Sequence, residues 1–452
     1  MKIGKIGTNR GITAIIKPTH NCNLDCRYCY IEKSAEDGTM NTVTLENSIK
    51  KIIEYNNRIR KSTHFIWHGG EPLLMGVDFF RKVYTLVQKY RMELSVKNSI
   101  QSNGTLITDE LIQFSMDVND FNIGLSIDGP AKLHNTTRPY KNGKNSFDDV
   151  YRAIKRMKKF GYSKGIGVIV TLSQYNLPYM DELYSFFKEN RINFKINPII
   201  TAGKARNCFE NMAITPLDYA KAMIELFDLW FYEEEYHIYI NPLAFIVGNI
   251  MTGTPIGCHF KRTCRNSFIS IGPLGDVYPC GRFDGSFEFK LGNINKTNLE
   301  EIFASEVYTK LQCRVPEMID ECKQCEFMKI CNAGCFHNAL ITTGSIMEKD
   351  NFCTGYKMIF RHINAAITNE INKIDQLNKS KDVQHVTKQE PITIELFGKK
   401  INVYEIKNPQ LQKIIKDRFL NDRAFNISCQ QYPDKEYSDY DAYQGEYDEY
   451  WE

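Results

Sequence analysis

The most informative stretch of this 452-residue chain is His20-Asn21-Cys22-Asn23-Leu24-Asp25-Cys26-Arg27-Tyr28-Cys29-Tyr30. It spaces three thiols as C-x3-C-x2-C directly after an apolar, strand-like run at residues 12–17. Three thiolates on a tight loop can bind three irons of a [4Fe–4S] cube and leave the fourth iron without a protein ligand. An iron with such an open position can chelate the amino and carboxylate groups of a small molecule. The alternative is a structural zinc site, although zinc prefers paired C-x2-C elements and a closed shell of four ligands.

This loop resembles the signature of the radical S-adenosylmethionine (radical SAM) enzymes. The resemblance implies that Cys22, Cys26 and Cys29 hold a site-open [4Fe–4S] cluster, which binds S-adenosylmethionine and cleaves it reductively to a 5′-deoxyadenosyl radical. It also implies that Tyr28, which stands between the thiols, shields the cluster. An external reductant such as flavodoxin or ferredoxin is then an expected partner.

Composition and charge exclude several other classes of protein. Apolar residues make up 42% of the chain and the formal net charge is only +3, without the basic stripe of a nucleic-acid binder. No stretch approaches the length of a membrane span, and residues 1–16 lack a signal-peptide core and a cleavage site. We therefore expect an anaerobic, cytoplasmic protein with neither nucleic-acid nor membrane partners. Its fourteen cysteines then indicate metal ligands, because the cytosol keeps thiols reduced.

Strand-like and helical segments alternate between residues 12 and 196. The patterns predict strands at residues 12–17, 63–67, 97–101, 121–127, 165–171 and 193–196, separated by helices at residues 43–55, 79–90, 108–115, 146–160 and 180–189. Strands separated by helices of this length require parallel crossovers. The expected fold class is therefore α/β, a partial (β/α)6 barrel whose functional residues lie at the carboxyl ends of the strands.

Polar and glycine residues follow several of these strands. The second strand leads into His68-Gly69-Gly70-Glu71-Pro72, which resembles a Gly-Gly-Glu-Pro element of the radical SAM family whose backbone meets the cofactor amino group. Arg138, in a turn at residues 135–138, suits a bidentate bond to the cofactor carboxylate. By the same resemblance, the residues expected at the cofactor are Tyr28, Gly69, Gly70, Glu71, Asn103, Ser126, Asp128 and Arg138. Each of the polar ones could instead serve only a turn or a helix cap.

A second group of cysteines lies beyond residue 257, around an expected hairpin at residues 271–280. Eight thiols suffice for two fully ligated [4Fe–4S] clusters, and their spacing resembles the SPASM domain of peptide- and protein-modifying radical enzymes. The resemblance implies one auxiliary cluster on Cys258, Cys264, Cys280 and Cys335 and another on Cys322, Cys325, Cys331 and Cys353. Two zinc ribbons are the alternative. The remaining thiols, Cys208, Cys313 and Cys429, fit no spacing.

These patterns divide the chain into six regions. They are an N-terminal segment (1–10), the partial barrel (11–215), a helical bridge (216–256), the SPASM auxiliary-cluster domain (257–365), a C-terminal β-β-α extension (366–435) and an acidic, Tyr-rich tail (436–452). The extension could receive a peptide leader by strand addition or cover the barrel mouth. The tail reads as a solvated segment. The alternative is that it folds back onto the barrel, either in the substrate channel as an internal pseudosubstrate or on a basic rim near Lys204 and Arg206.

The combined motifs predict a radical SAM oxidoreductase that modifies a peptide or protein side chain. The favoured reaction is maturation of a ribosomally made peptide by a thioether or carbon-centred crosslink. The first alternative is an anaerobic sulfatase-maturating enzyme, which forms formylglycine. That family places an aspartate directly after the cysteine equivalent to Cys280, where this chain has Gly281. Asp276, Asp284 and His68 are weak candidates for catalysis. An alternative of another class is a non-catalytic iron–sulfur electron carrier or redox sensor.

Overall fold

The computed structural model describes residues 11–31, 38–162, 165–206, 212–233, 238–262, 264–380, 393–396, 399–403 and 406–415. The N-terminal segment, the acidic tail and two of the unassigned cysteines, Cys208 and Cys429, lie outside these residues. The third, Cys313, is exposed. No helix in the described part of the chain is both long and apolar enough to cross a bilayer.

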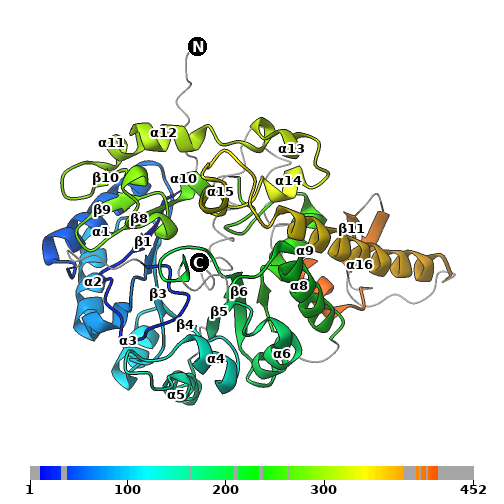
Figure 1. The fold of residues 1–452 in the computed structure, drawn as a ribbon, viewed down its shortest axis with the longest axis horizontal. Helices are drawn as coiled ribbons and strands as arrows, with labels where there is room; N and C mark the ends of the chain where they lie inside the picture. Colours follow the sequence, from blue (N-terminus) through cyan, green and yellow to red (C-terminus); the bar gives the residue numbers. More distant parts are fainter. Residues whose placement is uncertain are drawn as a thin grey trace, which may run out of the picture.

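Six parallel strands form the centre of the fold and pair with one another in chain order. They are β1 (Thr13–Ile16), β2 (Thr63–Trp67), β3 (Val96–Ser102), β4 (Phe121–Ser126), β5 (Gly167–Leu172) and β6 (Asn193–Pro198). The crossover helices are α1 (Thr42–Arg58), α2 (Val77–Tyr90), α3 (Asp109–Asp117), α5 (Phe147–Lys159) and α6 (Met180–Glu189), and they cover the outside of the curved sheet (Figure 1). The predicted partial barrel is therefore confirmed.

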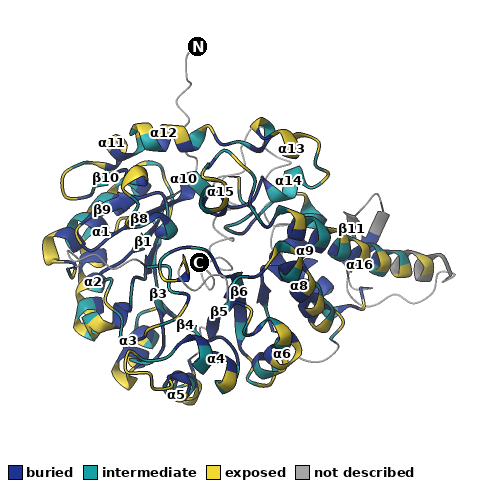
Figure 2. Ribbon diagram, viewed as in Figure 1, coloured by how far each residue is buried: buried dark blue, intermediate teal, exposed yellow. Residues whose placement is uncertain are grey.

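The buried faces of these elements follow from their sequence periods. Along β3 every second residue is buried, and the apolar residues of α5 recur at helical spacing on its buried side. Figure 2 shows buried residues along the strands and along the inner sides of the surrounding helices. One continuous apolar cluster extends from the barrel into the helices that follow it.

One barrel element differs from the expectation. The segment expected to turn at residues 135–138 belongs to a helix, α4 (Ala131–Thr137), and Arg138 is its C-terminal cap. Pro130 directly precedes the helix, and a fixed proline φ suits a helix start. Two helical turns therefore carry the chain from Asp128 back to the barrel mouth.

The cysteine-rich region continues the barrel sheet. β8 (Phe268–Ile271) pairs in parallel with β1, and the antiparallel strands β9 (Asp276–Tyr278) and β10 (Gly292–Asn293) follow, so that the expected hairpin is present. β7 (Ile240–Asn241) extends the other edge beside β6. The result is a ten-stranded sheet within the described residues. The proposed domain boundaries remain predictions, because this one sheet runs across them.

Helices complete the remaining described regions. α8 (Pro216–Phe231) and α9 (Leu243–Thr252) pack against α16 (Cys353–Ser380), which begins at a cysteine. The short helices of the cysteine-rich region are α10 (Cys264–Ser267), α11 (Leu299–Phe303), α12 (Glu306–Gln312), α13 (Asp320–Lys323), α14 (Met328–Cys331) and α15 (Phe336–Thr343). An antiparallel hairpin of β11 (Thr393–Leu396) and β12 (Lys399–Asn402), with α17 (Pro409–Ile415) packed on α9, forms the expected β-β-α extension.

Candidate active site

A cavity of about 280 Å³ has a wall shared by the barrel and the cysteine-rich region. Polar residues at the carboxyl ends of β3, β4 and β5 line one part of it, as a barrel active site requires. Seven thiols also line it, namely Cys22, Cys26, Cys29, Cys258, Cys264, Cys280 and Cys335. The structure thus brings the C-x3-C-x2-C loop and four cysteines of the later region to one cavity.

A second, smaller cavity is lined by the other four cysteines, Cys322, Cys325, Cys331 and Cys353. The eight thiols of the cysteine-rich region therefore line two cavities in the two sets of four that the resemblance to the SPASM domain implies. No disulfide joins any of the twelve cysteines in the described part of the chain.

The chemistry of these donor sets fits iron–sulfur clusters. Desolvation by burial raises the pKa of the Cys26 and Cys280 thiols to about 12 each. Nearby thiols add to the shift, because a second negative charge close by also disfavours the thiolate. Metal ligation requires deprotonated sulfur, so cationic iron would supply the compensating charge. Three thiols on one loop and two sets of four match one site-open and two fully ligated cubes.

Gly69 and Gly70 let the segment after β2 lie against the cysteine loop. Gly70 N–H donates to Thr19 O at 2.9 Å, and Glu71 N–H donates to Asn21 O at 2.8 Å. A Cβ atom added at Gly70 would stand 2.2 Å from Asn21 O, and Gly69 has φ +119°. Both glycines line the cavity, but their small size is needed first for this backbone contact.

Glu71 acts on the cavity through its neighbours. Its fully buried carboxylate accepts hydrogen bonds from Ser102 Oγ at 2.8 Å, from Asn103 N at 2.7 Å and from Leu73 N at 3.0 Å. Burial raises the pKa of Glu71 to about 7, although these bonds partly oppose the shift. Asn103, which does line the cavity, donates to Asn23 Oδ1 at 2.8 Å. Glu71 therefore positions Asn103 instead of facing a ligand itself.

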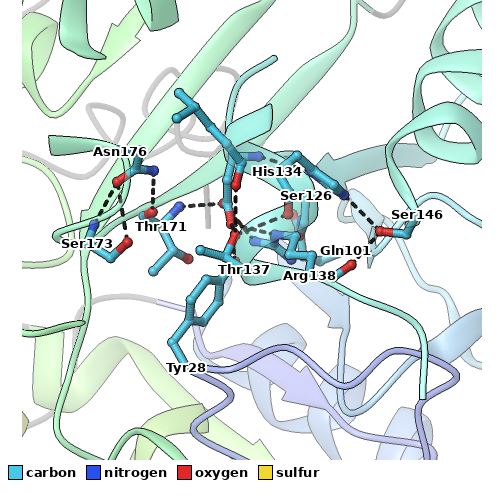
Figure 3. Close-up of polar contacts among 12 residues, drawn as sticks. Tyr28, Gln101, Ser126, His134, Thr137, Arg138, Ser146, Thr171, Ser173 and Asn176 are labelled. Atoms are coloured by element: carbon cyan, nitrogen blue, oxygen red, sulfur yellow. Dashed lines mark hydrogen bonds and ion pairs between the residues drawn. The ribbon is translucent and has the colours of Figure 1, made fainter. Parts of the chain in front are cut away.

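Asp128 is the centre of a buried hydrogen-bond network, and Figure 3 labels its partners Tyr28, Thr137, Arg138 and Thr171. Its carboxylate accepts hydrogen bonds from Tyr28 Oη at 2.5 Å, Thr137 Oγ1 at 2.7 Å and Thr171 N at 2.9 Å. Arg138 donates to both carboxylate oxygens, at 3.0 and 3.2 Å. Asp128 has no exposed surface, whereas Tyr28 and Arg138 line the cavity. Asp128 was expected to face the cofactor side, but it instead holds these two lining residues.

This network also changes the expectation for Arg138. Its Nε and Nη2 atoms, one bidentate edge of the guanidinium, are bonded to Asp128. Only the remainder of the group can meet a cofactor carboxylate. Ser126 does line the cavity as expected, and Gln101 Nε2 donates to its hydroxyl at 3.1 Å.

Neither aspartate proposed for catalysis is suited to act as a base. Asp276, at the start of β9, pairs with Lys290 at 2.8 Å on the outer hairpin and does not line the cavity. Asp284 accepts from Lys17 Nζ at 2.8 Å and pairs with His20 Nε2 at 2.8 Å. Burial opposes its ionisation, but the charge of Lys17 and the hydrogen bond with His20 outweigh burial and hold the pKa of Asp284 well below its ordinary value. Asp284 is therefore an ionised partner of Lys17 at pH 7.

His68 lines the cavity but is set up as a donor. Burial and the charge of Lys17 lower the pKa of His68 to about 4, so the ring is neutral at pH 7. Gly69 N–H donates to its Nδ1 at 2.7 Å, which leaves the ring proton of the neutral form on Nε2. His68 can therefore donate a hydrogen bond into the site.

Several other residues at the site belong to no motif that the sequence reveals. Positive or polar groups line the cavity at Lys195, His259 and Arg282, and the ring of Tyr30 also lines it. The ammonium of Lys17 lies buried below the cavity, paired with Asp284. The only signal for Lys17 was a lysine that ends a buried strand immediately before the cysteine loop. Arg282 was marked only by its place two residues after Cys280.

Comparisons with known proteins agree with this geometry. Residues 16–187 match the radical SAM superfamily model, and residues 262–326 match the SPASM model, an iron–sulfur cluster-binding domain. The cysteine-type anaerobic sulfatase-maturating enzyme of Clostridium perfringens is 30% identical over 379 residues, covering 80% of this chain and 99% of that enzyme. The serine-type enzyme of Bacteroides thetaiotaomicron is 30% identical over 363 residues, covering 76% of this chain and 86% of the relative.

A solved structure described as native anSMEcpe with bound AdoMet superposes with a TM-score of 0.71 at 29% identity, covering 80% of this chain and 100% of that one. The same protein with bound AdoMet and a Cp18Cys peptide gives a TM-score of 0.70 at 27% identity. The cofactors of this chain are therefore S-adenosylmethionine, a radical-generating [4Fe–4S] cluster and auxiliary iron–sulfur clusters. The chain is an enzyme, and it belongs to the radical SAM/SPASM family that includes the anaerobic sulfatase-maturating enzymes.

Proposed function

We propose that this enzyme oxidises a side chain of a peptide or protein that enters the 280 Å³ cavity. The observation that carries the proposal is the shared wall, in which the three loop thiols and the four thiols Cys258, Cys264, Cys280 and Cys335 line one space. When bound, S-adenosylmethionine and its cluster supply a 5′-deoxyadenosyl radical that abstracts a hydrogen atom. The auxiliary thiols would hold an electron acceptor at the same cavity, and a flavodoxin or ferredoxin would serve as reductant.

The chain's own residues would divide the remaining tasks. Cys22, Cys26 and Cys29 would hold the site-open cluster, and the two sets of four thiols would hold the auxiliary clusters. Tyr28, Asn103, Ser126 and Arg138 line the part of the cavity nearest the barrel strands and would orient the cofactor. Glu71 and Asp128 would keep those lining side chains in place from the buried side.

For the substrate, we propose first a cysteine or serine that is converted to formylglycine. Support comes from the two relatives, one cysteine-type and one serine-type, of which this chain covers 99% and 86%. Oxidation of a serine to formylglycine removes two electrons and two protons. A cysteine loses the same electrons and protons to give a thioaldehyde, which water hydrolyses to formylglycine with release of hydrogen sulfide. Each oxidation therefore needs a hydrogen-atom acceptor, an electron acceptor and a base.

This chain differs from the sulfatase-maturating family at the position expected to supply the base. Gly281 stands where the sulfatase-maturating family is expected to have aspartate, and the described residues that line the cavity include no carboxylate. This observation favours a second candidate, a peptide maturase that forms a thioether or carbon-centred crosslink. The two candidates share the cofactors and the cavity but differ in the peptide that is consumed.

Anaerobic reconstitution with dithionite and S-adenosylmethionine separates the candidates. The enzyme would be given a sulfatase-type peptide with cysteine, its serine counterpart, and short cysteine- or aromatic-rich peptides encoded beside its own gene. Formylglycine, detected by mass and by hydrazide capture, supports the first candidate, and a peptide that loses two hydrogens without an aldehyde supports the second. Failure to form 5′-deoxyadenosine with any peptide would contradict both.

The variant Gly281→Asp sharpens this test. Gly281 does not have a left-handed φ, and the nearest atoms to an added Cβ are Ile15 side-chain carbons at 3.5 and 3.6 Å and Lys17 Cε at 3.7 Å. The new carboxylate would thus fit beside a buried ammonium. If formylglycine is the product, this variant should form it faster than the wild type. If the product is a crosslink, the added carboxylate should give no aldehyde.

A further inference from the structure

Arg282 connects the cavity to the cysteines of the later region. It follows Cys280 by two residues and lines the cavity. Its Nη1 donates to Asn338 Oδ1 at 2.9 Å and lies 3.9 Å from Cys335 Sγ. A guanidinium is always charged, so a positive charge stands beside the sulfur of one candidate cluster ligand.

Asn338 holds that guanidinium without cancelling its charge. This residue of α15 is fully buried, and its Nδ2 donates to the two carboxylate oxygens of Asp350 at 3.1 and 3.3 Å. Its amide therefore separates Arg282 from Asp350. Direct contact between guanidinium and carboxylate would pair the two charges, whereas a neutral spacer orients the cation and leaves its field directed at Cys335.

Asp350 extends the connection to the second cavity. It lines the space surrounded by Cys322, Cys325, Cys331 and Cys353, and its side chain is buried. Its carboxylate also accepts from Cys335 N at 2.8 Å. Gly334 permits this approach, because a Cβ there would stand 2.4 Å from Asp350 Cβ. One carboxylate from the wall of the second cavity thus fixes both Cys335 and the residue that orients Arg282.

We propose that Asn338 and Asp350 are positioning residues that hold Arg282 against Cys335, and that the charge of Arg282 raises the reduction potential of the cluster held by Cys258, Cys264, Cys280 and Cys335. This inference rests on the cluster assignment made under the proposed function. Hydrogen bonds to cluster sulfurs and local net charge set the potential of an iron–sulfur cluster. Reduction adds one negative charge, which a nearby cation stabilises. The cluster thereby accepts more readily the second electron that oxidation of the substrate releases.

The test is a redox titration of the reconstituted full-length enzyme, followed by electron paramagnetic resonance. The signal of this cluster is identified as the one that Cys335→Ser removes or shifts. Asn338→Asp is nearly isosteric. It removes the donor to Asp350 and places this pair of carboxyl groups, with at least one negative charge, directly against Arg282, whereas Arg282→Gln removes the cation. Each should lower the reduction equilibrium constant by about tenfold or more, which is about 59 mV for a one-electron couple. Arg282→Lys, which keeps the charge, should recover part of the shift.

A matched control is Arg58→Gln, which removes an exposed arginine at the end of α1 that pairs with Glu300 of α11. The reduction potential of the cluster in Arg58→Gln should equal that in the wild type. Unchanged potentials in Asn338→Asp and Arg282→Gln, with full iron content, would overturn the inference. A loss of iron in Arg282→Gln together with an unshifted potential in Asn338→Asp would also overturn it, because Arg282 would then only build the site. A wild-type enzyme without any auxiliary signal or auxiliary iron would instead refute the cluster assignment itself.

Discussion

The substitution Asp128→Asn tests the network below the cavity. The amide keeps the shape of the side chain, but it removes the negative charge and turns one acceptor into a donor. The Arg138 guanidinium, itself buried, would then face a neutral group, as would the Tyr28 hydroxyl. Removing one partner of a buried ion pair costs about 3–5 kcal/mol, because the other charge stays buried. We expect a loss of that size in the free energy of unfolding.

Urea unfolding, followed by circular dichroism, would measure this loss across the set Asp128→Asn, Arg138→Gln and the double variant. The double variant should be more stable than Asp128→Asn alone, since no unpaired cation remains. Asp78→Asn, which removes an exposed carboxylate paired with Arg81, should leave the midpoint unchanged. A single variant Asp128→Asn that unfolds at the wild-type midpoint would refute the role of the network.

The pH dependence gives a second check on the same pair. Burial disfavours the Asp128 carboxylate, but Arg138 outweighs burial and lowers its pKa below the ordinary value of 3.8. A lowered folded-state pKa contributes stability that is present above the unfolded-state pKa and is lost as pH falls through the folded-state value. The difference between wild type and Asp128→Asn should therefore persist between about pH 5 and pH 8 and shrink below about pH 4.

Three further predictions follow from the cavity and its surroundings. Replacing Cys22, Cys26 and Cys29 together by alanine should abolish 5′-deoxyadenosine formation and remove about four of about twelve irons, as iron assays would show, and retained cleavage would contradict the loop assignment. Burial raises the pKa of Glu71 from its ordinary value of 4.5 to about 7, so the wild type should lose stability relative to Glu71→Gln as pH rises from about 4.5 to about 7. A difference in urea midpoint that stays constant over this range would contradict the buried protonated form. Asp276→Asn should leave the rate of cofactor cleavage at the wild-type value, because Asp276 pairs with Lys290 outside the cavity, and a large loss of rate would return it to the catalytic candidates.

The parts of this fold that the sequence predicts are those encoded by local periods and spacings. Alternating strand and helix patterns are sufficient for the partial barrel, whereas the division of the eight later thiols into two groups of four came from the resemblance to the SPASM domain. The parallel pairing of β8 with β1 could not be predicted, because local sequence patterns do not indicate which strands pair when they lie so far apart in the chain. The helix α4 was missed because the seven residues of Ala131–Thr137 carry too short a pattern to distinguish a helix from a turn.

The roles of acidic residues were harder to predict than their positions. Asp128 and Glu71 both follow strands that end at the cavity, which makes each resemble a ligand-facing group. Whether such a side chain points into the cavity or into the core depends on backbone direction within one or two residues. Here both side chains point into the core. Lys17 and Arg282 were missed for a related reason, since their importance comes from neighbours, Asp284 and Asn338, that lie far away in sequence.

The pairing of β8 with β1 bears on how the chain can assemble during synthesis. Until residue 268 has been made, residue 13 and its neighbours form the uncovered edge of a growing parallel sheet, a surface that invites pairing with other chains. Contacts between such distant segments also form slowly, because a large loop must close first. The cysteine-rich region therefore protects the barrel as well as serving its chemistry, and a nascent chain released before residue 268 would be exposed to aggregation.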